Sequence, residues 1–355
     1  MLSTSDYPFG KAWLGFYSAI MIIGIGETIL DIIFKNDQPV AAVPGGSTFN
    51  ALISLGRVLR PSKSPLKGDL EGDSNSLPLR GNGEGVVFVS EVGTDHVGDI
   101  IVSFLAENGV SAEYVNRRKN TKSHISLAFL DEHNDAQYQF YKDHANVSIE
   151  NKFPEVKKGD IVVFGSYFAV NPVLRPLVKA FLERAYKAGA FIYYDINFRA
   201  SHINDIPVIL PAIIENMKMS TVVRGSLEDF QYLYTTPENP LSAAEVYEQY
   251  IKPYCPCFIC TNGGKPVELF TPAVRAEFPT TPVETVSTIG AGDNFNAGFI
   301  YGIEKTRREG AELSIADFST MSVDVWQPLI GYGQRFSTAV CQSFNNYVDK
   351  DFSIS

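Results

Sequence analysis

The residues best suited to chemistry lie in a glycine-rich turn near the C-terminal end of the chain. Gly290, Ala291 and Gly292 precede Asp293 and the apolar-periodic segment Phe295 to Ile303, which predicts a helix. The N–H groups in the first turn of a helix have no internal partners, and small residues let an anion come close to them. We therefore expect this turn to bind a phosphoryl group and to stabilise the charge that develops on it.

The carboxylate beside this turn has an ordinary explanation and a chemical one. Asp293 could be an acid at a helix N-terminus, where the helix dipole stabilises it by about 0.3–1 kcal/mol. Alternatively, Asp293 takes a proton from a hydroxyl group that then attacks phosphorus. The second explanation predicts a kinase with Asp293 as its general base, and we favour it because several other motifs accompany the turn.

Two polar residues near the N-terminal end could bind a sugar through hydrogen bonds to its hydroxyl groups. Asp31 follows the apolar segment Met21 to Gly26, and Asn50 comes shortly after Gly45 and Gly46 at the start of a predicted helix. A carboxylate accepts hydrogen bonds, whereas an amide both accepts and donates them, so together they suit vicinal hydroxyl groups. An aspartate after a strand is otherwise usually a turn residue.

Six segments of the chain occur in the order of the motifs of one enzyme family. The chain resembles the ribokinase or PfkB family of carbohydrate kinases from Met21 onward. This resemblance implies a ribokinase-like α/β fold, with a central, mainly parallel sheet flanked by helices and a small β-sheet lid. The matching segments are Gly24 to Asp31, Gly45 to Asn50, Glu91 to Gly98, Asp195 to Arg199, Thr261 to Gly264 and Ser287 to Asp293.

The resemblance also assigns site residues. It implies that Gly290, Ala291, Gly292 and Asp293 are catalytic. The implied substrate-binding residues are Asp31, Gly45, Gly46, Asn50, Phe140, Lys142, Asn197 and Arg199. The implied nucleotide-binding residues are Ser226, Thr261, Gly263 and Asn346, with a late helix around Ala339 to Asn346 beside the adenine. Arginine suits phosphate because of its fork of donors, although a surface ion pair also explains Arg199.

The chain departs from the family pattern at two places. Where the family has its N-x-x-E motif, Ser226 precedes Glu228 and Asp229, which could hold Mg²⁺ through water or could simply cap a helix. Ser287 and Ile289 replace an aspartate and a threonine that are usual in the family's glycine-rich turn, which in relatives adjoins a monovalent-cation site. ATP and Mg²⁺ are therefore the expected cofactors, and dependence on potassium stays open.

The elements that must position these residues alternate between apolar strands and helices. We predict strands at 86–90, 160–165, 190–195 and 220–223, and helices at 48–58 and 173–188. Such alternation is typical of a mainly parallel sheet with helices on both faces. Ligands of such sheets gather at the carboxyl ends of the strands, and Asp195, Ser226, Thr261 and Gly290 all fall just after predicted strands.

Two segments predict a small sheet outside the main one. Residues 123–131 and 136–142 are β-type runs joined by polar turn residues, which indicates a hairpin. With residues 28–34 they could form a small sheet, and we expect lid strands within about 28–45 and 112–142. In the resembled family such a sheet covers the sugar, which would exclude water, and often pairs to make a homodimer.

One segment precedes the expected kinase domain of residues 21–355, and another interrupts it. We expect residues 1–20 to be a dispensable extension, with Met21 as a candidate start. The uncharged run Ala12 to Gly26 imitates a signal peptide but is shorter than the about 20 residues that span a bilayer. Residues 59–85 are rich in proline, glycine, serine and charge, and we expect a disordered insertion there, with a functional loop as the alternative.

Composition narrows the functional class further. The chain has 355 residues, is 45% hydrophobic and carries a net charge of −10, so it can bury a core but lacks the basic character that nucleic acid requires. Among its four cysteines, Cys255, Cys257 and Cys260 are bunched together. We interpret them as part of a buried strand and not as a zinc site. A cytoplasmic protein without membrane partners is expected.

Other phosphate-binding motifs fail. Lys265 is followed by Pro266, which breaks a P-loop pattern, and Ile29 stands where a dinucleotide fingerprint needs its third glycine. The sequence predicts an ATP-dependent kinase that phosphorylates a primary hydroxyl group of a small sugar, a fructose-like ketose or a sugar acid. The alternatives are a ribose or nucleoside kinase, and a catalytically weak regulator that binds sugar or nucleotide.

Overall fold

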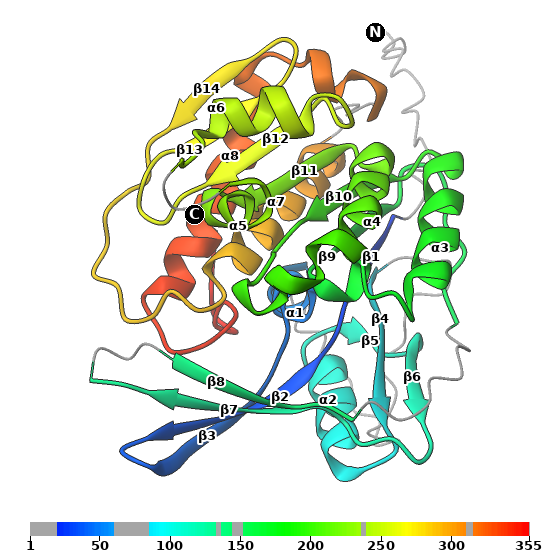
Figure 1. Cartoon of the computed structure of the whole chain (residues 1–355), viewed down its shortest axis with the longest axis vertical. Coiled ribbons are helices and arrows are strands. Elements are labelled where there is room, and N and C mark those ends of the chain that lie inside the picture. The colour runs from blue at the N-terminus through cyan, green and yellow to red at the C-terminus, as the bar shows by residue number, and fades with distance from the viewer. Residues whose placement is uncertain are drawn as a thin grey trace, which may run out of the picture.

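Two separate sheets make up the frame of the protein. The computed structural model describes residues 20–59, 85–132, 136–143, 152–235, 239–309 and 315–354. A ten-stranded sheet runs through the centre, and a four-stranded sheet projects from one end of it (Figure 1). None of the helices in the described ranges is long and apolar enough to cross a bilayer. The predicted fold class is confirmed.

The large sheet has the strand order β14-β13-β12-β11-β10-β9-β1-β4-β5, and β6 also pairs with β4. All of its pairings are parallel except β12 with β13 and β13 with β14. Its strands are β1 (Met21–Ile25), β4 (Gly85–Gly93), β5 (Val110–Ser111), β6 (Val115–Arg118), β9 (Ile161–Gly165), β10 (Phe191–Asp195), β11 (Val222–Ser226), β12 (Phe258–Thr261), β13 (Val267–Phe270) and β14 (Arg275–Phe278).

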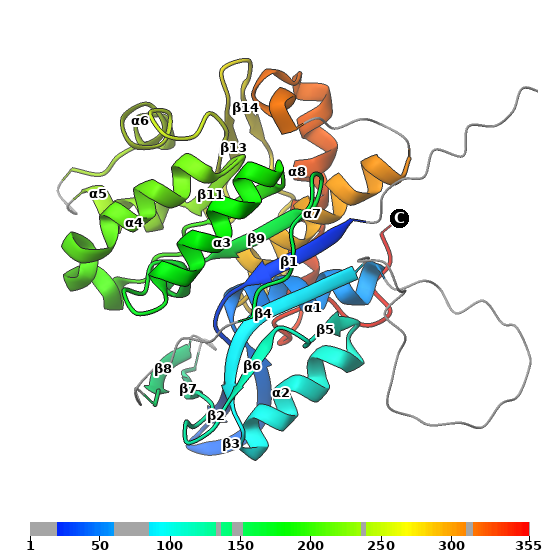
Figure 2. The same ribbon diagram turned by 90° about the vertical axis from the view of Figure 1, so that its right-hand side faces the viewer.

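Helices cover both faces of this sheet, as Figure 2 shows, because its central strands are apolar on both sides. One face carries α1 (Ser47–Leu59), α2 (His96–Glu107), α7 (Ala291–Arg308) and α8 (Val323–Cys341). The other carries α3 (Arg175–Ala188), α4 (Ile206–Met219), α5 (Leu227–Tyr234) and α6 (Ala243–Val246). The shorter helices are η1 (Tyr167–Ala169), η2 (Ala200–Asp205), the π-helix η3 (Tyr247–Ile251) and η4 (Ile315–Thr320).

The small sheet has the order β3-β2-β7-β8, formed by β2 (Ile29–Lys35), β3 (Gln38–Gly45), β7 (Ile125–Leu130) and β8 (Ala136–Tyr141). The predicted hairpin of β7 and β8 is present as an antiparallel pair. Asp31 on β2 is in register with Ser126 on β7, which is in register with Phe140 on β8. Residues in register on neighbouring strands project from the same face, so these three side chains share one face of the small sheet.

Several expected boundaries differ from those in the structure. We expected a strand at residues 220–223. Strand β11 instead begins at Val222, two residues later, and ends at Ser226. Gly290 does not follow a strand: β14 ends at Phe278, and a loop separates it from α7. Helix α8 ends at Cys341, before Asn346. The expected extension of residues 1–20 and insertion of residues 59–85 lie outside the described residues except at their ends, where Leu59 belongs to α1 and Gly85 to β4.

Candidate active site

The turn before α7 needs its glycines. Gly290 caps the helix in the left-handed conformation, with φ 76°, and a Cβ there would lie 2.8 Å from the backbone oxygen of Asn346. A Cβ on Gly292 would lie 2.9 Å from Nη2 of Arg224. An L side chain at either position would therefore meet strain or a clash, which explains the small residues in this turn.

The N–H groups of this turn are divided between the fold and the surface. The N–H of Ala291 donates to the carbonyl oxygen of Thr288 at 3.2 Å and so closes the turn. It is therefore not a free donor, contrary to the expectation for the first turn of a helix. In the part of the chain that the structure describes, the N–H groups of Gly290, Gly292 and Asp293 have no acceptor. Three free donors at a helix N-terminus make an anion-binding site.

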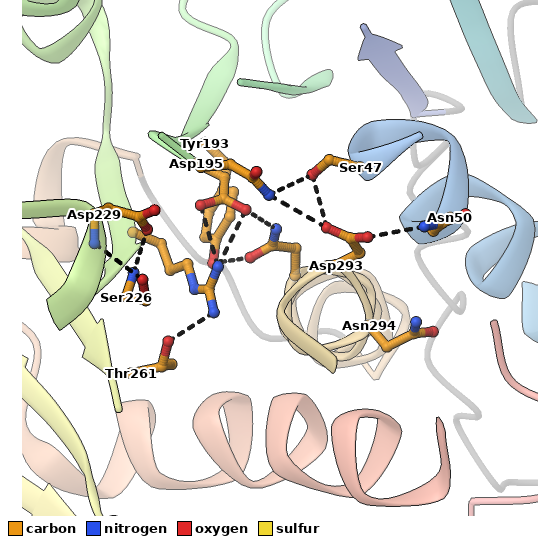
Figure 3. A network of polar contacts seen from close by, with 12 residues as sticks. Ser47, Asn50, Tyr193, Asp195, Ser226, Asp229, Thr261, Asp293 and Asn294 are labelled. Atoms are coloured by element: carbon orange, nitrogen blue, oxygen red, sulfur yellow. Dashed lines mark hydrogen bonds and ion pairs between the residues drawn. The ribbon is translucent and has the colours of Figure 1, made fainter. Parts of the chain in front are cut away.

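Asp293 lies where the N-terminal ends of α1 and α7 meet, as Figure 3 shows. Its Oδ1 accepts a hydrogen bond from the Ser47 hydroxyl at 2.7 Å, and its Oδ2 accepts one from the Asn50 amide at 2.9 Å. The carboxylate is only 7% exposed. Burial raises the pKa of Asp293 above its usual value, and the hydrogen bonds from Asn50 and Ser47 offset part of that rise. An elevated pKa suits a general base.

The side-chain amide of Asn197 contacts both Ser47 and Asp293. Its Nδ2 donates to the Ser47 hydroxyl at 2.9 Å and lies 3.5 Å from Oδ1 of Asp293. The backbone of Asn197 has φ 40°, a left-handed conformation that asparagine tolerates better than most residues. The residue follows β10, so the end of a parallel strand delivers this amide to the carboxylate.

Four of the expected sugar-binding residues lie close together: Asp31, Gly45, Gly46 and Asn50. The Ser126 hydroxyl donates to Oδ1 of Asp31, and burial raises the pKa of Asp31 to about 6. The buried Oδ1 of Asn50 has no hydrogen-bond partner among the described residues. A Cβ on Gly45 would lie 2.7 Å from Oδ2 of Asp31, and Gly46 has φ 128°. A side chain at Gly45 would collide with the Asp31 carboxylate. Because the Asn50 carbonyl has no partner among the described residues, it is left to accept a ligand's hydroxyl group.

Asn346 lies between the glycine-rich turn and Gly45. Its Nδ2 lies 3.5 Å from the position of a Cβ on Gly45, which also borders Asp31. Its backbone oxygen accepts a hydrogen bond from the Asn294 amide at 2.9 Å. The side chain therefore faces the space beside Asp31, on the expected sugar side, because the chain turns back after α8 ends.

The small sheet brings aromatic residues to the same face as Asp31. Phe140 is 57% exposed, and its ring centroid lies 5.8 Å from that of Tyr138, in a stacked arrangement. Partial burial and the nearby Asp31 carboxylate raise the pKa of Tyr138 to about 12. Lys142 pairs with Glu27 at 2.8 Å, so its charge is already neutralised. The Lys142 Nζ also lies over the Phe140 ring, 5.4 Å from its centroid, and the ring remains more than half exposed.

Arg199 is exposed at the mouth of this region. Within the described residues it makes no hydrogen bond or ion pair, yet it lies near enough to Asp293 for its charge to lower the pKa of that carboxyl. The competing interpretation, a surface ion pair, has no support from these contacts. An unpaired guanidinium near the anion-binding turn suits a phosphate.

A buried polar network lies beneath the turn. Arg224, 5% exposed, contacts both carboxylate oxygens of Asp195 at 3.2 Å and donates to the Thr261 hydroxyl at 2.7 Å. The Asn296 amide donates to Asp195 at 2.6 Å. Burial alone would lower the pKa of Arg224, but the neighbouring Asp195 outweighs it and keeps the guanidinium charged. The ends of β10, β11 and β12 are thereby joined to α7.

The Ser226 to Asp229 segment forms a capping box. Ser226 Oγ accepts from the N–H of Asp229 at 3.2 Å, and Oδ2 of Asp229 accepts from the N–H of Ser226 at 2.6 Å. Glu228 accepts a hydrogen bond from Tyr232. In the described ranges, no three His, Cys, Asp or Glu side chains cluster closely enough to hold a metal ion. These residues fit Mg²⁺ only as partners through water of an ion held mainly by phosphates.

The remaining expected residues lie along the next strand. Thr261 ends β12, and Gly263 follows with φ 54° and no atom within 4 Å of a Cβ built on it, so this edge is open for a nucleotide. The thiols of Cys255, Cys257 and Cys260 are buried, and burial raises the pKa of Cys255 to about 12. They pack as small apolar residues, as interpreted from the sequence, but only Cys260 lies within strand β12 (Phe258–Thr261).

Three residues of this site were missed from the sequence: Ser47, Tyr138 and Arg224. A serine after two glycines signals only a turn, and a tyrosine in a strand signals only a strand. Arg224 did leave a signal, because it interrupts the apolar strand Val222–Ser226 at a position that a buried sheet fills with hydrophobic residues.

Comparison with known proteins places the chain among sugar kinases. The model of the pfkB family of carbohydrate kinases matches residues 22–316. A probable fructokinase-5 of Arabidopsis thaliana is 22% identical over 80% of this chain and 83% of its own length. A fructokinase of Vibrio alginolyticus is 24% identical over 78% of this chain and 81% of its own length.

Solved structures have the same fold. The fructokinase of Vibrio cholerae O395 with fructose, ADP and calcium bound is 18% identical with a TM-score of 0.71, covering 93% of this chain and 95% of its own. Aminoimidazole riboside kinase of Salmonella enterica, complexed with aminoimidazole riboside and an ATP analogue, is 16% identical with a TM-score of 0.70, covering 91% and 94%.

Proposed function

The chain belongs to the pfkB family of carbohydrate kinases, and we propose that it transfers the γ-phosphoryl group of ATP to a primary hydroxyl group of a small neutral ketose such as fructose. The observation that carries the proposal is the buried carboxylate of Asp293 at the meeting point of two helix N-termini. On one side of it lie free N–H donors for a phosphate, and on the other lie Asp31 and Asn50 for a sugar.

The chemistry follows from these positions. Asp31 and Asn50 bind hydroxyl groups of the sugar and present one hydroxyl to Asp293. Asp293 takes the proton of that hydroxyl as its oxygen forms a bond to the γ-phosphorus, and the bond between this phosphorus and the bridging oxygen breaks, leaving ADP. The N–H groups of Gly290, Gly292 and Asp293 stabilise the negative charge on the moving phosphoryl group.

ATP fits the open edge of the sheet between this turn and β12. The unhindered backbone at Gly263 and the Thr261 hydroxyl border the nucleotide, and Arg199 binds its phosphates. Mg²⁺ would be held by those phosphates, with Asp229 or Glu228 contacting it through water, and would neutralise phosphate charge. Asp229 supports this role only in part, because the residue is buried and its Oδ2 already accepts the hydrogen bond from the N–H of Ser226 in the cap of α5.

A neutral sugar is favoured over a sugar acid. A sugar carboxylate would need a spare cation beside Asp31, but Lys142 of the small sheet is already paired with Glu27. The relatives named fructokinase support the same choice. Phe140 offers an apolar ring to the sugar from the small sheet, which acts as a lid that keeps water from competing for the phosphoryl group.

The test measures the release of ADP from ATP, in the presence of Mg²⁺, with a coupled colorimetric assay. The acceptors compared are fructose, ribose, a sugar acid and a riboside. We expect turnover with fructose well above the rate without sugar, and little with the sugar acid. Preferred turnover of ribose or a riboside would replace the substrate assignment. Saturable sugar binding with no turnover would instead identify a regulator and overturn the proposal.

A further inference from the structure

Ser47 occupies an unusual position in this site. Its hydroxyl lies between two partners whose chemistry fixes the direction of both hydrogen bonds. The amide nitrogen of Asn197 can only donate, and the ionised carboxylate of Asp293 can only accept. The Ser47 proton therefore points to Oδ1 of Asp293, and its lone pair accepts from Asn197.

The two oxygens of Asp293 are consequently unequal. Oδ1 receives Ser47 at 2.7 Å and, more weakly, Asn197 at 3.5 Å, so both of its lone pairs face donors. Oδ2 receives only Asn50 at 2.9 Å and keeps one lone pair without a donor among the described residues. The carbonyl oxygen of that same Asn50 amide is buried without a partner, so the unfilled acceptors lie side by side.

We propose that Ser47, with Asn197 behind it, is a positioning residue that holds Oδ1 of Asp293 and thereby leaves Oδ2 as the atom that accepts the substrate's proton. This inference rests on the proposed function for the identity of the substrate. The hydrogen bond from Ser47 stabilises the ionised form of Asp293 and keeps the base ready at neutral pH.

Other charges face Asp293 from the neighbouring elements. Asp195 at the end of β10 raises its pKa, and Arg199 just beyond that strand lowers it. Tyr138 on β8 is within electrostatic reach and is neutral at the pH values concerned. All three stay in place when Ser47 is changed, so a change in titration can be assigned to the lost hydroxyl.

The chain offers a matched control. Ser54 lies on the same helix α1 and is fully buried; its hydroxyl donates to Asn294 at 2.5 Å and accepts from the N–H of Val348 at 3.1 Å. Ser54→Ala thus removes a buried hydroxyl from the same contact of α1 with α7 without touching Asp293. Ser47→Thr keeps the hydroxyl and serves as the rescue variant.

The test is the pH profile of kcat at saturating fructose and ATP, for which sugar binding keeps Asp31 out of the profile. Ser47→Ala should move the acid limb upward by on the order of one pH unit, since it removes one donor to the ionised form. Ser54→Ala and Ser47→Thr should leave the limb in place. An unmoved limb in Ser47→Ala, or an equal shift in Ser54→Ala, would overturn the proposal.

A second measurement does not depend on turnover. In protein labelled at the aspartate carboxyl carbons, the resonance of Asp293 is identified by its loss in Asp293→Asn. Its NMR titration midpoint should be higher in Ser47→Ala than in the unchanged protein. Equal midpoints would refute the role of Ser47 even if no sugar is turned over, whereas absent turnover with shifted midpoints would refute only the proposed function.

Discussion

Three buried carboxylates in this site differ in their hydrogen-bond and ion-pair partners. Asp293 is held between donors from two helices, Asp31 has one serine hydroxyl, and Asp195 is paired with a guanidinium. Burial raises the pKa of the first two, so they bind or lose protons closer to neutral pH than ordinary aspartates do. Such perturbed groups in one place are typical of a functional site.

The raised pKa of Asp31 has a consequence for stability. Its pKa is about 6 in the folded protein and 3.8 in the reference state, so the unfolded chain favours the ionised form more than the folded chain does. Stability is therefore lower above pH 6 and recovers as the pH falls from about 6 to about 4. The proposed function explains this cost, because in it the Asp31 carboxylate binds the sugar.

Asp31→Asn should consequently raise stability and abolish function. At pH 7.5 we expect the free energy of unfolding to increase by on the order of 1–3 kcal/mol, with the gain vanishing below about pH 4. Fructose binding should be lost. Urea unfolding at several pH values and calorimetric titration with fructose measure the two effects.

Asp37→Asn, in the exposed turn between β2 and β3, is the control and should change neither the free energy of unfolding nor fructose binding. A destabilised Asp31→Asn protein at pH 7.5 would show that the buried carboxylate carries no such cost.

At the scale of elements, the turn before α7 combines a strained backbone with free N–H groups. Gly290 needs a positive φ, and its neighbour Asn346 leaves no room for a Cβ. Gly290→Ala should therefore lower the free energy of unfolding by on the order of 1–3 kcal/mol and greatly reduce turnover, because the N–H donors shift. Thermal unfolding and ADP release measure this.

Gly331→Ala is the matched control for that variant. Gly331 lies within helix α8, its φ is not in the left-handed region, and no atom lies within 4 Å of a Cβ placed on it. We expect its turnover to be unchanged and its free energy of unfolding to stay the same or rise by up to about 1 kcal/mol. If both alanine variants behaved alike, the turn would not have the strict backbone requirement derived from its geometry.

Strand β8 of the small sheet contains a built-in comparison. Phe140 and Tyr141 are adjacent and almost equally exposed, at 57% and 54%, but they project from opposite faces, and only Phe140 shares the face of Asp31. Phe140→Ala should raise the KM for fructose severalfold, because a ring of this kind contributes through buried apolar area. Tyr141→Ala should leave it unchanged. Steady-state kinetics with varied fructose separates the two, and equal effects would contradict a covering role for this face.

Much of the fold could be predicted because its signals are local. The strand at residues 160–165 and the helix at residues 173–188 are visible in the sequence from the spacing of their apolar residues. The hairpin of β7 and β8 is visible as two β-type runs separated by polar residues. The position of Asp293 in the first turn of a helix was predicted from its glycine-rich surroundings. Residues whose role depends on a distant partner left little signal: Ser47 acts on a residue on another helix, and Asn346 returns to Gly45 only after α8 has ended.

At the scale of the whole molecule, the site lies where three parts of the fold meet. The carboxyl ends of β10, β11 and β12 supply Asp195, Ser226 and Thr261, and the two helices α1 and α7 supply Asn50 and Asp293. Asp31 on β2 and Phe140 on β8 come from the small sheet, which lies below the large sheet in Figure 1. In the proposed function, the strand ends provide the nucleotide side and the small sheet the sugar side, in keeping with the position of ligand sites in parallel sheets.

The buried ion pair of Arg224 and Asp195 holds this meeting point together. Each partner is less than one-tenth exposed, and the guanidinium also contacts Thr261 on β12 and lies against Gly292 of the turn. Removing one partner of such a pair leaves a buried charge uncompensated. The network thus fixes the turn before α7 relative to the sheet, so the free N–H groups and Asp293 keep their positions before any ligand binds.

The most direct measurement compares the unchanged protein with Asp293→Asn. Asparagine keeps an oxygen for the Ser47 hydroxyl but cannot take a proton from the sugar. Turnover with fructose and ATP should fall by on the order of 10²-fold or more, while calorimetry should show ATP binding largely retained. A fully active Asp293→Asn protein would contradict the account, because no other carboxylate in the described structure is placed between the anion-binding turn and the sugar residues.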